Sequence, residues 1–181
     1  MTRECNARAF IGLYDGERSH VAIQYAINNY DMHNLCIITS ADRRDGLFWQ
    51  EVLRDIGYNG KVTIDSWQRI RQYENVDNAF FIFDGNVVRN NSTWARSFLK
   101  IAKKNSWIVT CDCFDNWMDL SNIFVACGFY KNRTEFIRKH VRFEPWCRYP
   151  KIKEYVNVDR LFDNLKKIYI KPQIDRGRLD E

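Results

Sequence analysis

The stretch Ala79-Phe80-Phe81-Ile82-Phe83-Asp84-Gly85 points to the fold class of this chain. It is a short apolar run, rich in aromatic residues, that ends in one carboxylate. A run of this length between polar residues predicts a strand buried on both faces. A carboxylate that ends such a strand lies at the carboxyl edge of the sheet, where open α/β folds bind ligands. Asp84 is therefore a candidate site residue, and it is followed by Gly85 instead of a second acid.

Apolar runs of the same kind alternate with amphipathic segments through the first two thirds of the chain. Strands are predicted at 8–13, where the chain enters a turn, and at 35–39, 61–64, 79–84 and 106–110. Helices are predicted at 19–30, 46–56, 66–73, 92–104 and 116–126, the second of them with Asp45 as its N-cap. This alternation predicts an α/β fold with a mostly parallel sheet covered by helices on both faces.

The pattern and the charge balance both change after Gly128. A basic helix is predicted at 134–140, an extended segment at 149–156, a charged helix at 158–165 and a last strand at 168–170. Residues 1–127 carry 14 basic and 15 acidic side chains, whereas residues 128–181 carry 14 basic and 8 acidic ones. We therefore predict an α/β core over 1–127 and a basic C-terminal part over 128–181 packed on the same domain. The basic excess favours an anionic partner, and a solvated lysine-rich surface is the alternative.

Composition indicates one globular domain. The chain has 181 residues, of which 45% are hydrophobic and 28% are charged. No apolar stretch approaches the ~20 residues that cross a bilayer, and the N-terminus lacks a secretory signal, so we expect a cytoplasmic protein without a membrane partner. The six cysteines are then expected to be reduced thiols. Cys111-Asp112-Cys113 lacks the spacing and the partners of a zinc or redox motif, so no metal site is predicted.

The loop after the first predicted strand has the position of a phosphate-binding loop, G-x-x-x-x-G-K-[ST]. Gly12 matches the first glycine and Ser19 the last hydroxyl, but Glu17 stands at the second glycine and Arg18 at the lysine. A carboxylate ~5 Å from a phosphate costs roughly 3 kcal/mol per like-charge pair at an effective dielectric of ~20. We therefore predict a degenerate nucleotide site. Its residues are Gly12, Gly16, Glu17, Arg18, Ser19, Asp84 and Gly85. The alternative is that this loop was never a phosphate loop.

Several segments together resemble one family. They are Ile37–Asp45, Val62–Trp67, Phe81–Gly85 and Trp107–Cys113, with Asn116–Asp119, Gly128–Phe136 and Tyr149–Lys151. From about Phe10 to Leu165 the chain resembles the first RecA-like lobe of superfamily-2 helicases, particularly the Swi/Snf-like or DEAD-like helicases of phages and prophages. The resemblance implies a single RecA-like domain of the P-loop NTPase type and a phage or prophage protein in a bacterial host.

The departures from that family concern its nucleotide motifs. Glu17-Arg18 replaces Gly-Lys, Gly85 replaces the second acid, and Cys111-Asp112-Cys113 replaces Ala-Thr-Pro, while no second RecA-like lobe is found in the sequence. We therefore expect no catalytic residues, no cofactor and no enzymatic activity. The expected function is binding of nucleic acid (DNA), of a protein partner, or of both. A host defence nuclease such as a CRISPR effector, which the protein would inhibit, is the protein partner that the phage resemblance suggests.

An ATPase or helicase subunit completed by a separate second-lobe protein is the alternative. In it, Ser19 and Asp84 would hold Mg²⁺ and Arg18 the phosphates. A nuclease built on Asp84, Asp112 and Asp115 has less support, because no lysine is paired with them in a recognisable motif.

Basic residues in three parts of the chain are the candidates for nucleic-acid or partner binding. They are Arg43 and Arg44 in the segment that contacts the nucleic-acid backbone in the family; Lys100, Lys103 and Lys104 at one helix end; and Lys131, Arg133, Arg138, Lys139 and Arg142. Trp117, Tyr130 and Trp146 are candidates for stacking on bases, with core packing as the stronger alternative for Trp117. The sequence predicts neither the oligomeric state nor a DNA sequence preference.

Overall fold

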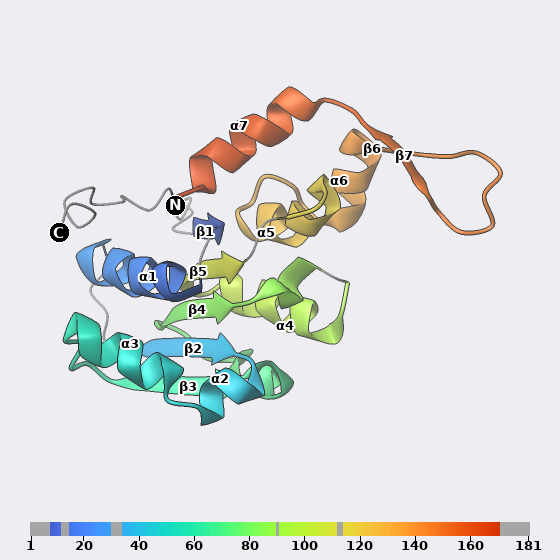
Figure 1. The fold of residues 1–181 in the computed structure, drawn as a ribbon. Coiled ribbons are helices and arrows are strands. Elements are labelled where there is room, and N and C mark those ends of the chain that lie inside the picture. Colours follow the sequence, from blue (N-terminus) through green and yellow to red (C-terminus); the bar gives the residue numbers. More distant parts are fainter. Residues whose placement is uncertain (1–7, 12–14, 30–33, 90, 112–113, 171–181) are drawn as a thin grey trace.

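A five-stranded parallel sheet forms the centre of the molecule in the computed structural model, which describes residues 8–11, 15–29, 34–89, 91–111 and 114–170. The strands are β1 (Arg8–Ile11), β2 (Leu35–Thr39), β3 (Val62–Ser66), β4 (Phe80–Asp84) and β5 (Ser106–Cys111). Their order across the sheet is β1-β5-β4-β2-β3, and every neighbouring pair is parallel (Figure 1). The predicted class of fold is therefore confirmed.

Both faces of the sheet are covered, which explains why β4 is apolar at every position before Asp84. Phe80 and Ile82 pack on one face with α1 (Asp15–Asn29) and α3 (Phe48–Ile56). Phe81 and Phe83 point to the other face because successive side chains of a strand alternate. There they pack with η1 (Trp67–Tyr73) and α4 (Thr93–Ala102).

The segment after β5 packs on the second of these faces. It begins with η3 (Trp117–Leu120) and α5 (Ser121–Ala126), and the basic C-terminal part then supplies α6 (Arg133–His140), β6 (Val141–Phe143), β7 (Ile152–Tyr155) and α7 (Val158–Ile168). Phe136, Leu161 and Ile168 belong to the same apolar cluster as Phe83. β6 and β7 form a separate antiparallel hairpin whose long loop projects away from the rest of the molecule (Figure 1).

Two predicted helices have different bounds in the structure. The helix predicted at 19–30 begins four residues earlier, at Asp15. The segment predicted as one helix at 46–56 contains only α3, and a separate short helix, α2 (Ala41–Asp45), precedes it. The N-cap of α2 is Ser40, whose Oγ accepts a hydrogen bond from the Arg43 backbone N–H at 3.2 Å. Asp45 is therefore the last residue of α2 and not the N-cap of α3.

Three further predictions need correction. The strand expected at 168–170 is absent from the described residues: Ile168 is buried as the last residue of α7, and Tyr169 forms only an isolated bridge. The helix expected at 66–73 is the 3₁₀ helix η1. The helix expected at 116–126 is divided into η3 and α5. Because these segments are short, packing on the core decides their geometry more than their local propensity does.

The described residues contain no helix both long and apolar enough to cross a membrane. Cys36, Cys111 and Cys127 are buried, whereas Cys147 is exposed. Burial raises the pKa of Cys36 to about 11, so this thiol stays protonated at neutral pH.

Candidate functional site

Three polar side chains meet where β2, β4 and β5 end. Asp84 pairs with Thr110 in the sheet register, and Thr39 follows Ile38, which pairs with Phe83. Thr39 Oγ1 donates to Asp84 Oδ2 at 2.6 Å, and Thr110 Oγ1 donates to Asp84 Oδ1 at 2.9 Å. Thr39, Thr110 and Asp84 are all buried. The carboxylate predicted at this edge of the sheet is therefore in place, bound on both oxygens.

Arg43 supplies the positive charge that balances Asp84. Its Nη1 lies 3.1 Å from Oδ1 and 2.9 Å from Oδ2 of the carboxylate. The guanidinium also lies over the ring of Phe48, 4.7 Å from the ring centroid. The short helix α2 thus holds a cation against the end of β4, and a carboxylate removed from water needs such a partner.

A second buried carboxylate, Asp65, lies near the end of β3, the strand that pairs with β2. Its Oδ1 accepts from the Ser66 backbone N–H at 2.7 Å, and its Oδ2 accepts from the Tyr73 hydroxyl at 2.9 Å. Arg44 Nη1 lies 3.8 Å from Oδ1, and it also donates to Ser66 Oγ at 3.1 Å. Burial, together with the hydrogen bond to Asp65, raises the pKa of Tyr73. Arg43 and Arg44 therefore each contact a buried carboxylate of the core.

Protein side chains already contact both carboxylate oxygens of Asp84. Mg²⁺ needs open carboxylate oxygens in near-octahedral geometry, whereas both oxygens of Asp84 already accept hydrogen bonds, and Arg43 is the cation beside them. Gly85 has φ +108°, a conformation that residues with a side chain rarely adopt. The backbone itself therefore disfavours an acid after Asp84. Among the described residues, no group of three or more His, Cys, Asp or Glu side chains would hold a metal ion.

The start of α1 corrects the predicted boundary between loop and helix in the segment 12–19. Gly16, Glu17, Arg18 and Ser19 belong to the first turns of α1 instead of a loop, and Gly12 lies outside the described residues. Arg18 and Ser19 are buried. Gly16, Glu17 and Arg18 therefore have helical backbone, and residues 12–14 of the predicted loop lie outside the described residues.

The predicted basic residues do not form one surface. Arg43 and Arg44 lie at the carboxyl edge of the sheet. Lys100, Lys103 and Lys104 lie at the opposite edge, where Asn105 bonds to the segment that leads into β4. Two of these lysines pair with acids, Lys100 with Glu74 at 2.7 Å and Lys104 with Asp77 at 3.8 Å.

The remaining predicted basic residues gather around α6. Lys131 precedes the helix; Arg133, Arg138 and Lys139 belong to it; and Arg142 follows it in β6. Arg138 and Arg142 are exposed, and Arg142 Nη1 donates to the Arg138 carbonyl at 3.3 Å. Lys139 pairs with Glu135 on the same helix. The α6 region is therefore where the predicted contacts come closest to forming a continuous basic surface.

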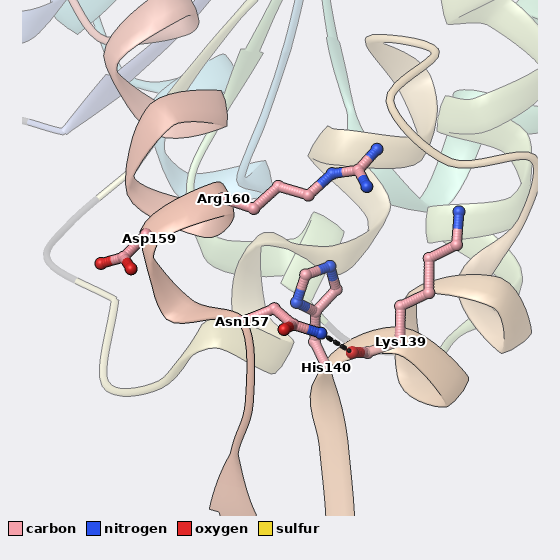
Figure 2. A pocket seen from close by; sticks show the side chains of 5 residues that line it. All are labelled: Lys139, His140, Asn157, Asp159 and Arg160. Carbon is pink, nitrogen blue, oxygen red and sulfur yellow. Dashed lines mark hydrogen bonds between the residues drawn. The ribbon is translucent and has the colours of Figure 1, made fainter.

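A shallow pocket of about 430 Å³ lies beside this region, between the end of α6 and the start of α7 (Figure 2). Its lining residues are Lys139, His140, Asn157, Asp159 and Arg160. Asn157 Nδ2 donates to the Lys139 carbonyl at 3.0 Å and so joins the two elements. None of its lining residues has a buried side-chain polar atom without a hydrogen-bond partner, and no sequence pattern indicated this pocket.

His140, at the floor of this pocket, is a structural residue. Its Nδ1 donates to the Val156 carbonyl at 3.0 Å, and its Nε2 accepts from the Tyr130 hydroxyl at 2.7 Å. The Tyr130 oxygen in turn accepts from Asn164 Nδ2 at 3.1 Å. Burial lowers the pKa of His140, which keeps the ring neutral, as this set of partners requires.

The three aromatic candidates for base stacking separate clearly. Tyr130 is buried, and Trp117 is half-buried between Phe114 and Phe162. Trp146 is completely exposed. Only Trp146 among the three therefore presents a free ring to a ligand.

Comparison with known proteins identifies the fold. No family model matches the chain, and neither does any curated protein sequence. Among solved structures, the chain is similar to "Sulfolobus solfataricus SWI2/SNF2 ATPase core in complex with dsDNA", with a TM-score of 0.63 and 11% sequence identity. The match covers 91% of this chain and 39% of that one. At this identity the likeness establishes the fold alone, that of a single RecA-like domain.

The sequence interpretation missed Thr39, Thr110, Asp65 and His140 as partners in the buried polar networks. A signal was present for the first three, because each is a polar residue at or near the end of an apolar strand. No comparable pattern marked His140. The clustered acids proposed for a nuclease do not assemble in the described residues: Asp115 is exposed and lies 3.8 Å from Arg89, and Asp112 lies outside them.

Proposed function

We propose that this protein is a RecA-like domain that does not hydrolyse nucleotides and acts by binding nucleic acid. The observation that carries the first part is the ion pair between Arg43 and Asp84. The residue that would hold the metal in an active site is here a buried structural carboxylate with a protein cation as its partner. Gly85, with its positive φ, supports the same conclusion.

Charge supports the second part. Residues 128–170 carry eleven basic and five acidic side chains, and Arg138 and Arg142 are exposed near the end of α6. Phosphate contacts from such side chains bind nucleic acid without sequence preference and weaken steeply with salt. The structural neighbour is described in complex with dsDNA, which makes DNA the first ligand to test.

The test measures Mg-ATP binding by calorimetry and phosphate release with and without DNA. We expect neither binding nor hydrolysis for the natural sequence. Arg43→Gln is the informative variant, because it removes the cation beside Asp84 and leaves Glu17 and Gly85 unchanged; it should not gain hydrolysis. Mg-dependent hydrolysis that Asp84→Asn abolishes in a folded protein would overturn the proposal. Hydrolysis that appears only with a separate second RecA-like lobe would favour the alternative of a two-protein ATPase.

We also propose a narrower role, in which a protein of phage origin acts in the bacterial cytoplasm and inhibits a host defence nuclease of the CRISPR type. Its support is the resemblance of the sequence to the phage-encoded branch together with the basic C-terminal part. The test measures DNA cleavage by such a nuclease at increasing concentrations of this protein. Undiminished cleavage at saturating concentration would count against this role and leave nucleic-acid binding untouched.

A further inference from the structure

The β6–β7 hairpin is firmly attached at its base. Val141 is buried opposite Tyr155 in the register, and the Tyr155 hydroxyl donates to Asn116 Oδ1 at 3.1 Å. The Val156 backbone N–H donates to the His140 carbonyl at 2.9 Å. The two strands leave the domain from a fixed base, so the direction of the projecting loop is set by the fold (Figure 1).

The hairpin remains ordered out to its loop. The register passes from Arg142 opposite Glu154 to Phe143 opposite Ile152, which leaves Lys153 as the extra residue of a bulge. Beyond the strands, the Glu144 backbone N–H donates to the Lys151 carbonyl at 2.9 Å, and their side chains pair at 3.1 Å. The tip is therefore the six-residue segment from Pro145 to Pro150.

The tip exposes aromatic rings. Trp146 is 101% exposed and Tyr149 is 74% exposed, while Phe143 at the end of β6 is 40% exposed. Trp146 has φ +70°, a conformation that bulky residues rarely adopt. Pro145 and Pro150, the first and last residues of the tip, restrict the backbone at its two ends. Trp146 therefore combines a strained backbone conformation with an exposed apolar ring. This arrangement does not contribute to core packing.

Positive charge accompanies these rings. Arg142, Arg148, Lys151 and Lys153 belong to the hairpin, against the acids Glu144 and Glu154. Lys151 balances Glu144, and the Arg148 guanidinium lies 5.7 Å from the centroid of the Tyr149 ring. The hairpin therefore combines exposed aromatic faces with a net positive charge along one projecting element.

We propose that the β6–β7 hairpin is a binding element for single-stranded nucleic acid, on which Trp146 and Tyr149 stack with unpaired bases while Arg142, Arg148 and Lys153 contact the backbone. The proposal rests on the nucleic-acid binding proposed above and names its ligand class and its site. Aromatic rings interleaved with cations bind single strands because every base offers a π face and every linkage a charge. In a duplex the faces of the bases are already stacked on one another, so the rings of Trp146 and Tyr149 cannot stack on them.

The experiment measures fluorescence anisotropy of a labelled oligothymidylate of about 20 nucleotides and of a duplex of equal length, at low salt. Trp146→Ala with Tyr149→Ala should raise the dissociation constant for the single strand about tenfold or more and leave duplex binding nearly unchanged. Trp146→Phe with Tyr149→Phe should stay within about threefold of the natural sequence, because phenyl rings still stack. Leu47→Ala removes another exposed apolar side chain, in the segment between α2 and α3, and is the matched control.

A second readout follows Trp146 directly. The difference in tryptophan emission between the natural sequence and Trp146→Phe reports this ring alone, and stacking on unlabelled oligothymidylate should quench that difference signal. Circular dichroism and the urea midpoint verify that the tip variants keep the fold.

The outcomes separate this inference from the function on which it rests. Single-strand binding that survives the double alanine change would overturn the hairpin site and leave nucleic-acid binding standing. Equal weakening for the duplex would overturn the assignment to single strands. The absence of binding to any nucleic acid by the natural sequence would overturn both, and the tip would then be assigned to a protein partner.

Discussion

At the scale of single residues, Asp84 and Arg43 show how a site residue becomes a structural one. Asp84 is buried and accepts hydrogen bonds from Thr39, Thr110 and Arg43. Removing one member of such a pair leaves a buried charge without a partner. The resulting loss of stability is larger than the net stabilisation that the ion pair itself provides. The first consequence of altering this pair should therefore appear in stability.

We predict that Arg43→Met lowers the free energy of unfolding by about 2–3 kcal/mol, somewhat less than for a fully buried pair because the Arg43 side chain is 26% exposed. Urea unfolding followed by circular dichroism measures the change. Arg54→Met on α3 is the control, because the Arg54 side chain is 75% exposed and its Nε lies 3.9 Å from Asp55 Oδ1. This change should lower the free energy of unfolding by no more than about 0.5 kcal/mol. Equal effects of the two changes would contradict a structural role for Arg43.

His140 leads to a prediction about pH. Burial lowers its pKa in the folded protein, whereas the unfolded chain binds the proton near pH 6.5. The contribution of neutral His140 to the free energy of unfolding is therefore complete above about pH 6.5. It decreases as the pH falls below that value, by at most about 1.4 kcal/mol per pH unit. Arg160 and Lys139 act in the same direction by repelling the charged ring. Urea unfolding at a series of pH values, compared with His140→Gln, measures this slope. Parallel curves for the two proteins would contradict the prediction.

At the scale of elements, α7 tests whether the basic C-terminal part and the α/β core form one cooperative unit. Leu161 and Ile168 are buried in the same apolar cluster as Phe83 of β4. We predict that Leu161→Ala lowers the stability of the whole protein by about 3 kcal/mol within a single unfolding transition. Lys166→Ala on the exposed side of the helix should change it by less than about 0.5 kcal/mol. A separate early transition in the Leu161 variant would show instead that the C-terminal part unfolds independently.

At the scale of the whole molecule, charge should determine where nucleic acid binds. Arg138→Glu with Arg142→Glu reverses two exposed charges beside the hairpin, whereas Arg54→Glu with Lys61→Glu reverses two exposed charges on α3 and before β3. We predict that the charge reversal at Arg138 and Arg142 weakens DNA binding at least tenfold. It should also reduce the steepness of log K against log salt concentration by about 1–2, because each lost phosphate contact removes about 0.7–0.9 from that slope. The second pair should have little effect. Anisotropy titrations across a salt series measure both, and equal losses would indicate binding governed by net charge alone.

The amino-acid sequence by itself determined the α/β class, the approximate positions of the five strands and the location of Asp84. These features are local, because an apolar run between polar residues is a strand signal wherever its partners lie. The same local reasoning failed at 46–56 and 168–170. Before the first of them, the serine cap of α2 is a local hydrogen bond that the periodicity count did not consider, whereas the burial of Ile168 depends on distant segments of the apolar cluster.

Tertiary structure alone decided what the polar residues do. Arg43 and Asp84 are 41 positions apart, and Tyr130 and Asn164 are 34 apart, so no local pattern shows that they meet. Exposure was likewise invisible: Trp117, Tyr130 and Trp146 are equally aromatic in sequence, yet only Trp146 faces solvent completely. The chain encodes its strands through side-chain periodicity, but the pairing of charges and the exposure of the hairpin tip arise only when distant segments pack together.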